Sequence, residues 1–240
     1  MRAAGAKLLL ATDFDGTAAA ISSDGADVNW APAAYALLSE LSHRSDTALA
    51  IISGRPMTDV ADYAASVRCF RAASFGAEVH DPNGVVIRSH AIFNFQLPEA
   101  AVTEAAAAGM WLEEKPHGLA LHWQNAFPVR EELRVIDTFS DWAKSRSLRL
   151  QSGRCFIEAN NHDFDKASAL QLIAEITRPR AVIFCGNDDS DARALEWAAA
   201  RGKAFFVQNN GGAPPTGCVS VESIETLWAR IRDAVVELLP

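Results

Sequence analysis

The feature that most constrains the fold is an uninterrupted apolar run over residues 8–11, which ends close to two acidic residues, Asp13 and Asp15. A short, continuous apolar run of this kind is typical of a strand buried within a sheet. Residues 7–12 are therefore predicted to form a buried strand that ends at Asp13. Segments with helical periodicity alternate with further apolar runs along the chain, and this alternation predicts an α/β fold with a parallel sheet.

The alternation is found on both sides of a different middle region. Before that region, we expect strands over 48–52 and 68–73 and helices over 32–44 and 57–66. After it, we expect strands over 181–185 and 204–207 and helices over 166–177, 189–201 and 222–239. The two flanking regions are therefore expected to form one sheet with helices around it.

The middle region has the pattern of a separate α+β insert. Hairpin signals occur at Asp81-Pro82-Asn83-Gly84 and around Gly153. The expected elements are strands over 78–80, 85–88, 111–115, 118–123, 148–152 and 155–158 and helices over 98–108 and 128–146. We therefore expect a core domain formed by residues 1–76 and 163–240, and a cap domain formed by residues 77–162.

Charge and cysteine usage limit the classes of partner. The formal net charge of −8 argues against general affinity for nucleic acid, which attracts basic surfaces. The four cysteines form no C-x-x-C pair and have no zinc-ligand spacing with a histidine, which favours a reducing compartment. No apolar run reaches the length of a membrane-spanning helix. We expect a cytoplasmic monomer that binds neither nucleic acid nor a membrane.

The sharpest chemical signal is Asp13-Phe14-Asp15-Gly16-Thr17, directly after the first predicted strand. Open parallel sheets bind their ligands beyond the carboxyl ends of the strands. Two carboxylates there, followed by a glycine that allows a tight turn, suit a hard cation such as Mg²⁺. The alternative is a polar turn between a strand and a helix, where Asp and Gly are common. We favour the metal site.

Three further polar segments have candidate roles. Ser53-Gly54-Arg55 follows a predicted strand, where a hydroxyl and backbone N–H groups can hold a phosphoryl oxygen. Lys166 begins a predicted helix and can neutralise a phosphoryl group. Residues 186–191, Gly-Asn-Asp-Asp-Ser-Asp, again follow a predicted strand. Each segment alone has an ordinary alternative, namely a turn, a solvated helix residue or a helix N-cap.

In this order, the four segments resemble the haloacid dehalogenase superfamily of phosphatases, and the resemblance covers the whole chain. It implies a Rossmann-like parallel sheet core with an inserted α+β cap, and a Mg²⁺ cofactor. In that superfamily the first Asp is the nucleophile and the second is the general acid/base, roles that fall here on Asp13 and Asp15. Ser53 and Lys166 would hold the phosphoryl group. The metal ligands would come from Asp13, Asp15, Asn187, Asp188 and Asp191, and which of the last three binds the metal directly is left open.

An acid at position 15 also favours one branch of the superfamily. The P-type ATPases lack an acid at that position and form a long-lived phosphoenzyme. Asp15 therefore indicates a phosphatase, because it can protonate the leaving group and then activate water. A phosphomutase is possible by superfamily membership alone, and no residue favours it.

Several segments are similar to trehalose-6-phosphate phosphatases, namely residues 50–55, 74–78, 114–123 and 186–191. The chain departs from their pattern at four positions. Phe75 replaces a His, Gln124 an Arg, Ala167 a Gly and Asn187 an Asp. An Asn carbonyl can still bind Mg²⁺. The change at Gln124 removes a forked, charged donor.

The resemblance also implies the substrate contacts, which are Gly54, Arg55, Glu78, Lys115, His122 and Glu158. The ordinary alternative for each charged one is a surface residue or a cross-strand charge pair. The leading hypothesis is hydrolysis of trehalose 6-phosphate, a small-molecule sugar phosphate. A second is hydrolysis of another sugar phosphate, such as sucrose 6-phosphate or a glycosyl-phosphoglycerate, which Phe75 and Gln124 motivate. A third, motivated by Asn187, is a sugar-phosphate-binding protein with little turnover.

Overall fold

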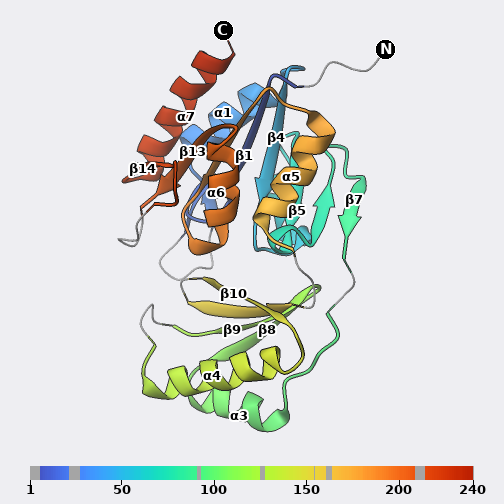
Figure 1. The fold of residues 1–240 in the computed structure, drawn as a ribbon, viewed down its shortest axis with the longest axis vertical. Coiled ribbons are helices and arrows are strands. Elements are labelled where there is room, and N and C mark those ends of the chain that lie inside the picture. Colours follow the sequence, from blue (N-terminus) through green and yellow to red (C-terminus); the bar gives the residue numbers. More distant parts are fainter. Residues whose placement is uncertain are drawn as a thin grey trace. The chain divides into compact units, whose positions relative to one another are not determined.

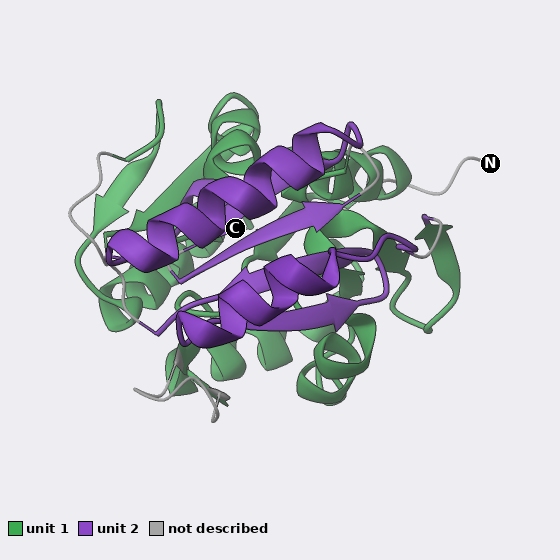
Figure 2. Ribbon diagram, turned by 90° about the horizontal axis from the view of Figure 1, so that it is seen from below, with its two compact units in different colours: residues 1–89, 164–187, 191–240 green, residues 90–163, 188–190 purple. Residues whose placement is uncertain are grey.

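The computed structural model describes residues 6–21, 28–90, 93–124, 128–153, 155–160, 164–208 and 214–239. The chain divides into two compact units, which Figure 1 and Figure 2 show as ribbons. Unit 1 contains Met1–Ser89, Phe164–Asn187 and Asp191–Pro240, and unit 2 contains His90–Asp163 and Asp188–Ser190. None of the helices in the described ranges is long and apolar enough to cross a membrane.

Unit 1 is built on one eight-stranded sheet. From edge to edge, its strands are β14 (Val219–Val221), β13 (Gly202–Val207), β12 (Ala181–Gly186), β1 (Leu8–Thr12), β4 (Thr47–Ile52), β5 (Phe70–Ala73), β6 (Glu78–His80) and β7 (Val86–Ser89). The strands from β14 to β5 are parallel, and β6 and β7 are antiparallel to their neighbours. Thr12 of β1 lies opposite both Cys185 and Ile51, so the three central strands end at the same edge.

Helices cover both faces of this sheet, and this explains why β1 is apolar at successive positions. The helices of one face are α1 (Pro32–Ser42), α2 (Met57–Tyr63) and α7 (Ile224–Leu238), and those of the other are α5 (Lys166–Thr177) and α6 (Ala192–Ala199). Leu8 and Leu10 point to the first face. Leu9 and Ala11 point to the second. All four side chains are fully buried, and each buried Leu stabilises the fold by roughly 1.5–3 kcal/mol. The predicted α/β class is confirmed.

Some short elements were not predicted. β2 (Ala19–Ile21), β3 (Val28–Trp30) and β14 have no strong signal in the sequence, because three residues are too few for a periodic pattern. β2 and β3 pair with each other in a separate two-stranded sheet. The 3₁₀ turn η1 (Ser74–Gly76) follows β5, and a second one, η2 (Asp189–Asp191), precedes α6.

The hairpin β6–β7 was predicted as a hairpin but was expected in the cap. β6 instead extends the core sheet, because Ala72 of β5 pairs with Val79 of β6. The structure therefore divides the chain after Ser89, whereas the sequence placed the boundary between residues 76 and 77. The other expected boundary, between residues 162 and 163, lies outside the described residues.

Unit 2 is an α+β unit with a four-stranded antiparallel sheet. Its strands, in spatial order, are β10 (Arg149–Gly153), β11 (Phe156–Asn160), β9 (Gly118–His122) and β8 (Trp111–Lys115). One face packs on α3 (Glu99–Ala107) and α4 (Arg130–Lys144), which lie over these strands in Figure 2. Leu121 and Ile157 point toward these helices. Because side chains alternate along a strand, residues of the other parity form the helix-free face of the sheet.

Candidate active site

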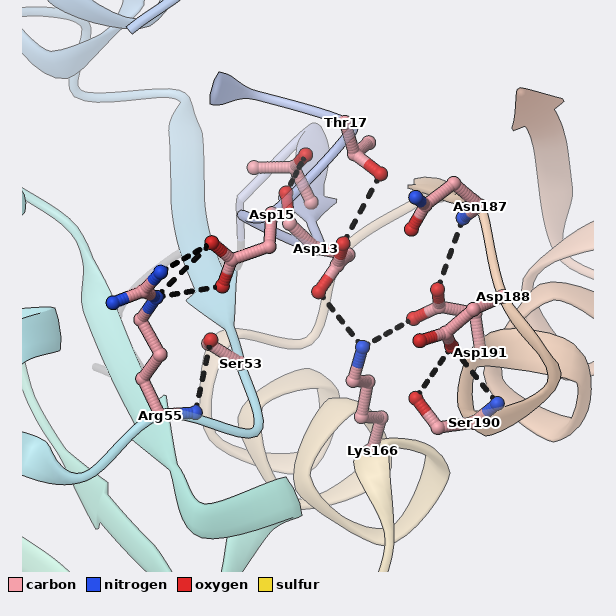
Figure 3. Close-up of polar contacts among 11 residues, drawn as sticks. Asp13, Asp15, Thr17, Ser53, Arg55, Lys166, Asn187, Asp188, Ser190 and Asp191 are labelled. Carbon is pink, nitrogen blue, oxygen red and sulfur yellow. Dashed lines mark hydrogen bonds and ion pairs between the residues drawn. The ribbon is translucent and has the colours of Figure 1, made fainter. Parts of the chain in front are cut away.

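Asp13 lies directly beyond the carboxyl end of β1, and only 3% of its surface is exposed. Lys166 Nζ lies 2.7 Å from Asp13 Oδ1, and the Thr17 hydroxyl donates to Asp13 Oδ2 at 3.1 Å (Figure 3). The Asp13 backbone N–H donates to the Cys185 carbonyl of the neighbouring strand. The carboxylate is therefore held at both oxygens and at the main chain. Thr17 was not predicted as a site residue, although it belongs to the first motif.

Lys166 links Asp13 to a second buried carboxylate. Its Nζ lies 2.8 Å from Asp191 Oδ1, and Asp191 is fully buried. Lys166 is the first residue of α5, and Asp165 caps that helix by accepting a hydrogen bond from the Ser168 N–H. Two carboxylates and one ammonium group carry a summed charge of −1. Carboxylate oxygens are ligands of the kind that a divalent cation prefers.

The segment after β12 contains a buried acceptor. Asp191 Oδ2 accepts a hydrogen bond from the Asn187 N–H at 3.0 Å. Gly186 permits this approach, because a Cβ there would lie 2.4 Å from Asp191 Cγ. Asn187 Oδ1 is buried and has no hydrogen-bond partner within the described ranges. Asp188 Oδ1 accepts two hydrogen bonds from Ser190, at 2.9 Å from its N–H and 2.6 Å from its hydroxyl.

These donors fit a magnesium ion. Mg²⁺ prefers oxygen ligands. Asp13 could supply a carboxylate, and Asn187 could supply an amide carbonyl that receives no hydrogen bond from the residues that the structure describes. In Figure 3 the Asn187 side chain points toward Asp13. Across the described part of the chain, no three His, Cys, Asp or Glu side chains form a metal-binding group. The Asn187 carbonyl is an oxygen ligand that lies outside these four residue types.

Ser53 and Gly54 follow β4 and lie against an unusual turn. Ser53 is fully buried, and its Oγ accepts a hydrogen bond from the Arg55 N–H at 3.1 Å. A serine hydroxyl can also donate its hydrogen to a ligand oxygen. A Cβ on Gly54 would lie 2.5 Å from Phe75 Cζ, so the Phe75 ring covers this glycine. Ser74 and Phe75 both have left-handed backbone angles, with φ of 47° and 56°, which cost roughly 1–3 kcal/mol per residue.

Arg55 and Asp15 form a forked ion pair. Arg55 Nε lies 3.0 Å from Asp15 Oδ1 and 2.8 Å from Oδ2, and Nη2 lies 2.8 Å from Oδ1. This hydrogen bonding raises the pKa of Arg55, against the opposing effect of burial. The pair joins the expected acid/base to a residue expected to bind substrate, and the sequence did not indicate this contact.

The helix-free face of the sheet in unit 2 brings together three predicted sugar contacts. Lys115 Nζ lies 2.8 Å from Glu158 Oε2 and 3.6 Å from Glu113 Oε2, and His122 Nε2 lies 2.8 Å from Glu113 Oε2. Burial raises the pKa of Glu158, although Lys115 opposes the shift. The hydrogen bond with His122 lowers the pKa of Glu113. Trp111 stacks on His122 with the ring centroids 5.3 Å apart.

Glu113 was missed by the sequence reasoning, although a signal for it existed. It stands two residues before Lys115 on a predicted strand, and side chains two apart share a face. Glu78, a further predicted substrate contact, lies on β6 in unit 1. Its Oε1 lies 2.6 Å from His80 Nε2.

Comparisons with known proteins connect this geometry to a family. Residues 11–213 match the trehalose-phosphatase family. The chain is 29% identical to the trehalose-phosphate phosphatase of Mycobacterium marinum over 215 residues, which cover 82% of this chain and 53% of that protein. It is also 29% identical to the probable trehalose-phosphate phosphatase of Sinorhizobium fredii over 186 residues, which cover 75% of this chain and 69% of that one. The chain thus spans about half the length of the mycobacterial relative.

Solved structures share the fold at lower identity. The C-terminal domain of C. albicans trehalose-6-phosphate phosphatase superimposes with a TM-score of 0.78 at 16% identity, covering 98% of this chain and 92% of that one. A haloacid dehalogenase-like hydrolase from B. subtilis superimposes with a TM-score of 0.61 at 13% identity, covering 83% of this chain and 88% of that one. The fold is therefore that of the haloacid dehalogenase-like hydrolases. Because the family match extends over most of the sequence, the chain belongs to the trehalose-phosphatase family.

Proposed function

We propose that the chain is a magnesium-dependent phosphatase that hydrolyses trehalose 6-phosphate through an aspartyl phosphate on Asp13. The observation that carries this proposal is the buried 2.7 Å contact between Lys166 Nζ and Asp13 Oδ1 at the carboxyl end of the central strand. A carboxylate held beside an ammonium group suits attack on a phosphoryl group, because the ammonium can attract the phosphoryl oxygens. Family membership supports trehalose 6-phosphate as the substrate.

In the first half of the reaction, an Asp13 carboxylate oxygen attacks phosphorus. A bond forms between phosphorus and Asp13, and the bond between phosphorus and the sugar oxygen breaks. Asp15 gives its proton to that sugar oxygen, which leaves as a hydroxyl group. Lys166, the Ser53 hydroxyl and the Gly54 N–H would hold the phosphoryl oxygens during transfer.

In the second half, Asp15 takes a proton from water as the water oxygen attacks phosphorus. The bond from phosphorus to Asp13 breaks, phosphate is released, and both carboxyl groups return to their starting forms. When bound, Mg²⁺ supplies positive charge that offsets the charge on the phosphoryl oxygens. Asp13 and Asn187 are the favoured protein ligands, and Asp15, Asp188 and Asp191 remain the other candidates.

In unit 2, we propose that Lys115, His122 and Glu158, together with Glu113, bind sugar hydroxyls. Glu158 Oε1 is buried and accepts no hydrogen bond from the described residues, which supports a ligand donor at this position. A buried carboxylate oxygen without a donor is unfavourable, and a sugar hydroxyl would satisfy it. Glu78, in unit 1, is proposed as a further substrate contact.

The test is a panel of phosphorylated sugars with Mg²⁺ or with EDTA. Trehalose 6-phosphate should give the highest kcat/KM, and EDTA should remove turnover. A clear preference for sucrose 6-phosphate or a glycosyl-phosphoglycerate would replace the first substrate with the second candidate, which Phe75 and Gln124 favour. Binding of sugar phosphate without metal-dependent release of phosphate would contradict the proposed enzyme and support a binding protein.

A further inference from the structure

The forked contact between Arg55 and Asp15 fixes the acid/base side chain in one orientation. Three distances of 2.8 to 3.0 Å join Nε and Nη2 of the guanidinium to the two carboxylate oxygens. Forked pairs of this kind constrain the plane of the carboxylate as well as its position. Oδ1 receives two of the contacts and Oδ2 receives one.

Arg55 is itself braced from one side. Its guanidinium lies over the Tyr63 ring, 5.4 Å from the centroid, and Nη1 lies 3.7 Å from Asp59 Oδ2. Asp59 and Tyr63 are both in α2, which begins two residues after Arg55. The guanidinium is therefore held between a helix and the carboxylate of Asp15, and Figure 3 shows it directed at that carboxylate.

The brace also connects back to the catalytic strand end. The Tyr63 ring stacks on Phe14, with the centroids 5.0 Å apart and the planes at 28°. Phe14 is buried and stands between Asp13 and Asp15 in the chain. Trp30 Nε1 donates to the Tyr63 carbonyl at 3.0 Å and so fixes the end of α2. Phe14 thus contacts Tyr63, Tyr63 contacts Arg55, and Arg55 contacts Asp15. Asp15 follows Phe14 directly in the chain.

We propose that Arg55, braced by Tyr63, is a positioning residue that holds Asp15 for proton transfer, and that it does not bind the substrate directly. This rests on the proposed function, because it concerns the acid/base step of that reaction. The donors Nε and Nη2 of Arg55 are occupied by Asp15, so they would have to release it to reach a phosphoryl or sugar oxygen. A misplaced acid/base is costly, since an error of 1 Å in a reacting group can reduce the rate by about 100-fold.

The identity of the leaving group separates positioning from binding. A sugar alkoxide is strongly basic and needs a proton as it leaves, whereas p-nitrophenolate departs without one. Loss of Asp15 orientation should therefore slow transfer from a sugar phosphate far more than transfer from p-nitrophenyl phosphate. Loss of a direct contact with the phosphoryl group, or a general structural defect, should affect both substrates alike. Loss of a direct contact with the sugar should raise KM for the sugar phosphate.

The experiment measures kcat and KM for both substrates in wild type, Arg55→Ala, Arg55→Lys, Tyr63→Leu and Tyr63→Phe. Arg55→Ala should lower kcat/KM for the sugar phosphate by about 100-fold, through kcat and not KM, and by less than about tenfold for p-nitrophenyl phosphate. Tyr63→Leu should also lower kcat/KM for the sugar phosphate, by a smaller factor. Tyr63→Phe keeps the ring and should retain near wild-type rates.

A matched control is available in the same unit. Arg44 forms an equivalent forked pair with Asp46, at 3.0 Å through both Nε and Nη2, on an exposed surface. Arg44→Ala should keep kcat/KM for both substrates within twofold of the wild-type values. The inference would be overturned if Arg55→Ala lowered kcat/KM equally for the two substrates, or if the decrease in kcat/KM came from a higher KM. If wild type releases no phosphate from any sugar phosphate, the proposed function fails instead, so the two failures are distinguishable.

Discussion

At the scale of single residues, the centre of unit 1 is a charged trio that is nearly excluded from solvent. The side chains of Lys166, Asp13 and Asp191 are 3%, 5% and 0% exposed. The ammonium group contacts both carboxylates, so its removal would leave two like charges close together in a poorly solvated site. Lys166 is therefore expected to stabilise the fold as well as to serve the proposed chemistry.

We predict that Lys166→Met lowers the free energy of unfolding by roughly 3–5 kcal/mol, because it leaves buried carboxylates without their cation. In the double variant Lys166→Met/Asp191→Asn, the decrease in the free energy of unfolding should be smaller than the sum of the decreases in the two single variants, since one of the repelling charges is gone. Urea unfolding of Lys166→Met, Asp191→Asn and the double variant measures these losses. The control is Lys7→Met, which removes a half-exposed partner of Asp46 and should cost less than about 1 kcal/mol. Additive losses at Lys166 and Asp191 would contradict the account of the trio.

Asn187 gives a second prediction at this scale, since its buried Oδ1 is the acceptor proposed to bind the metal. Asn187→Ala should raise the Kd for Mg²⁺ by more than about tenfold, a loss at least as large as that caused by removing an outer-shell partner. Asn187→Asp should lower the Kd, because it adds a negative charge to the ligand set. Calorimetry without substrate measures both constants. Asn83→Ala, in an exposed turn, should leave the Kd unchanged, and unaltered binding in Asn187→Ala would exclude this ligand.

At the scale of elements, the site depends on the close approach of the loop after β4 to η1. The Phe75 ring covers Gly54, and the Phe75 N–H donates to the Ser53 carbonyl at 2.9 Å. The same ring lies 6.0 Å from Lys166 Nζ, measured to its centroid. The cost of the left-handed backbone at Ser74 and Phe75 is therefore offset by the contacts of this ring with Gly54 and Lys166.

We predict that Gly54→Ala lowers the free energy of unfolding by about 1–3 kcal/mol, because the new methyl group overlaps the Phe75 ring. Adding Phe75→Leu should recover part of this loss, since the leucine side chain lacks the overlapping ring atoms. A double-mutant cycle from denaturant unfolding should give a coupling energy above about 0.5 kcal/mol. A coupling energy near zero would show that Gly54 is not constrained by this ring.

The elements that the sequence predicted well are those that contain a continuous buried apolar run. β1, β4 and β12 contain such runs because both faces of the sheet are covered. The β6–β7 hairpin was also predicted, but local residues do not specify which sheet a hairpin joins. Its pairing with β5 is a tertiary contact, and this explains the difference in the domain boundary. The turn at Ser74 and Phe75 carried no signal, because neither residue favours a left-handed backbone.

At the scale of the whole molecule, the parallel topology collects residues from distant parts of the sequence. β1 lies between β12 and β4, and the segments after all three strands supply Asp13, Asn187, Asp191 and Ser53. The strand pattern alone predicts that these segments meet at one edge. The role of Lys166 came from the resemblance to a family, since a lysine at a helix start has no distinctive pattern. The Arg55–Asp15 pair was not predictable, because local sequence does not specify which carboxylate a guanidinium binds.

The central claim is that Asp13 is a covalent nucleophile, and acid-quenched single turnovers with phosphate-labelled trehalose 6-phosphate test it most directly. In the presence of Mg²⁺, wild type should carry transient label on the peptide that contains Asp13, and the label should decay as phosphate appears. Asp13→Asn should carry no label and release no phosphate. Phosphate release by Asp13→Asn at the wild-type rate, or label on a different residue, would contradict the account.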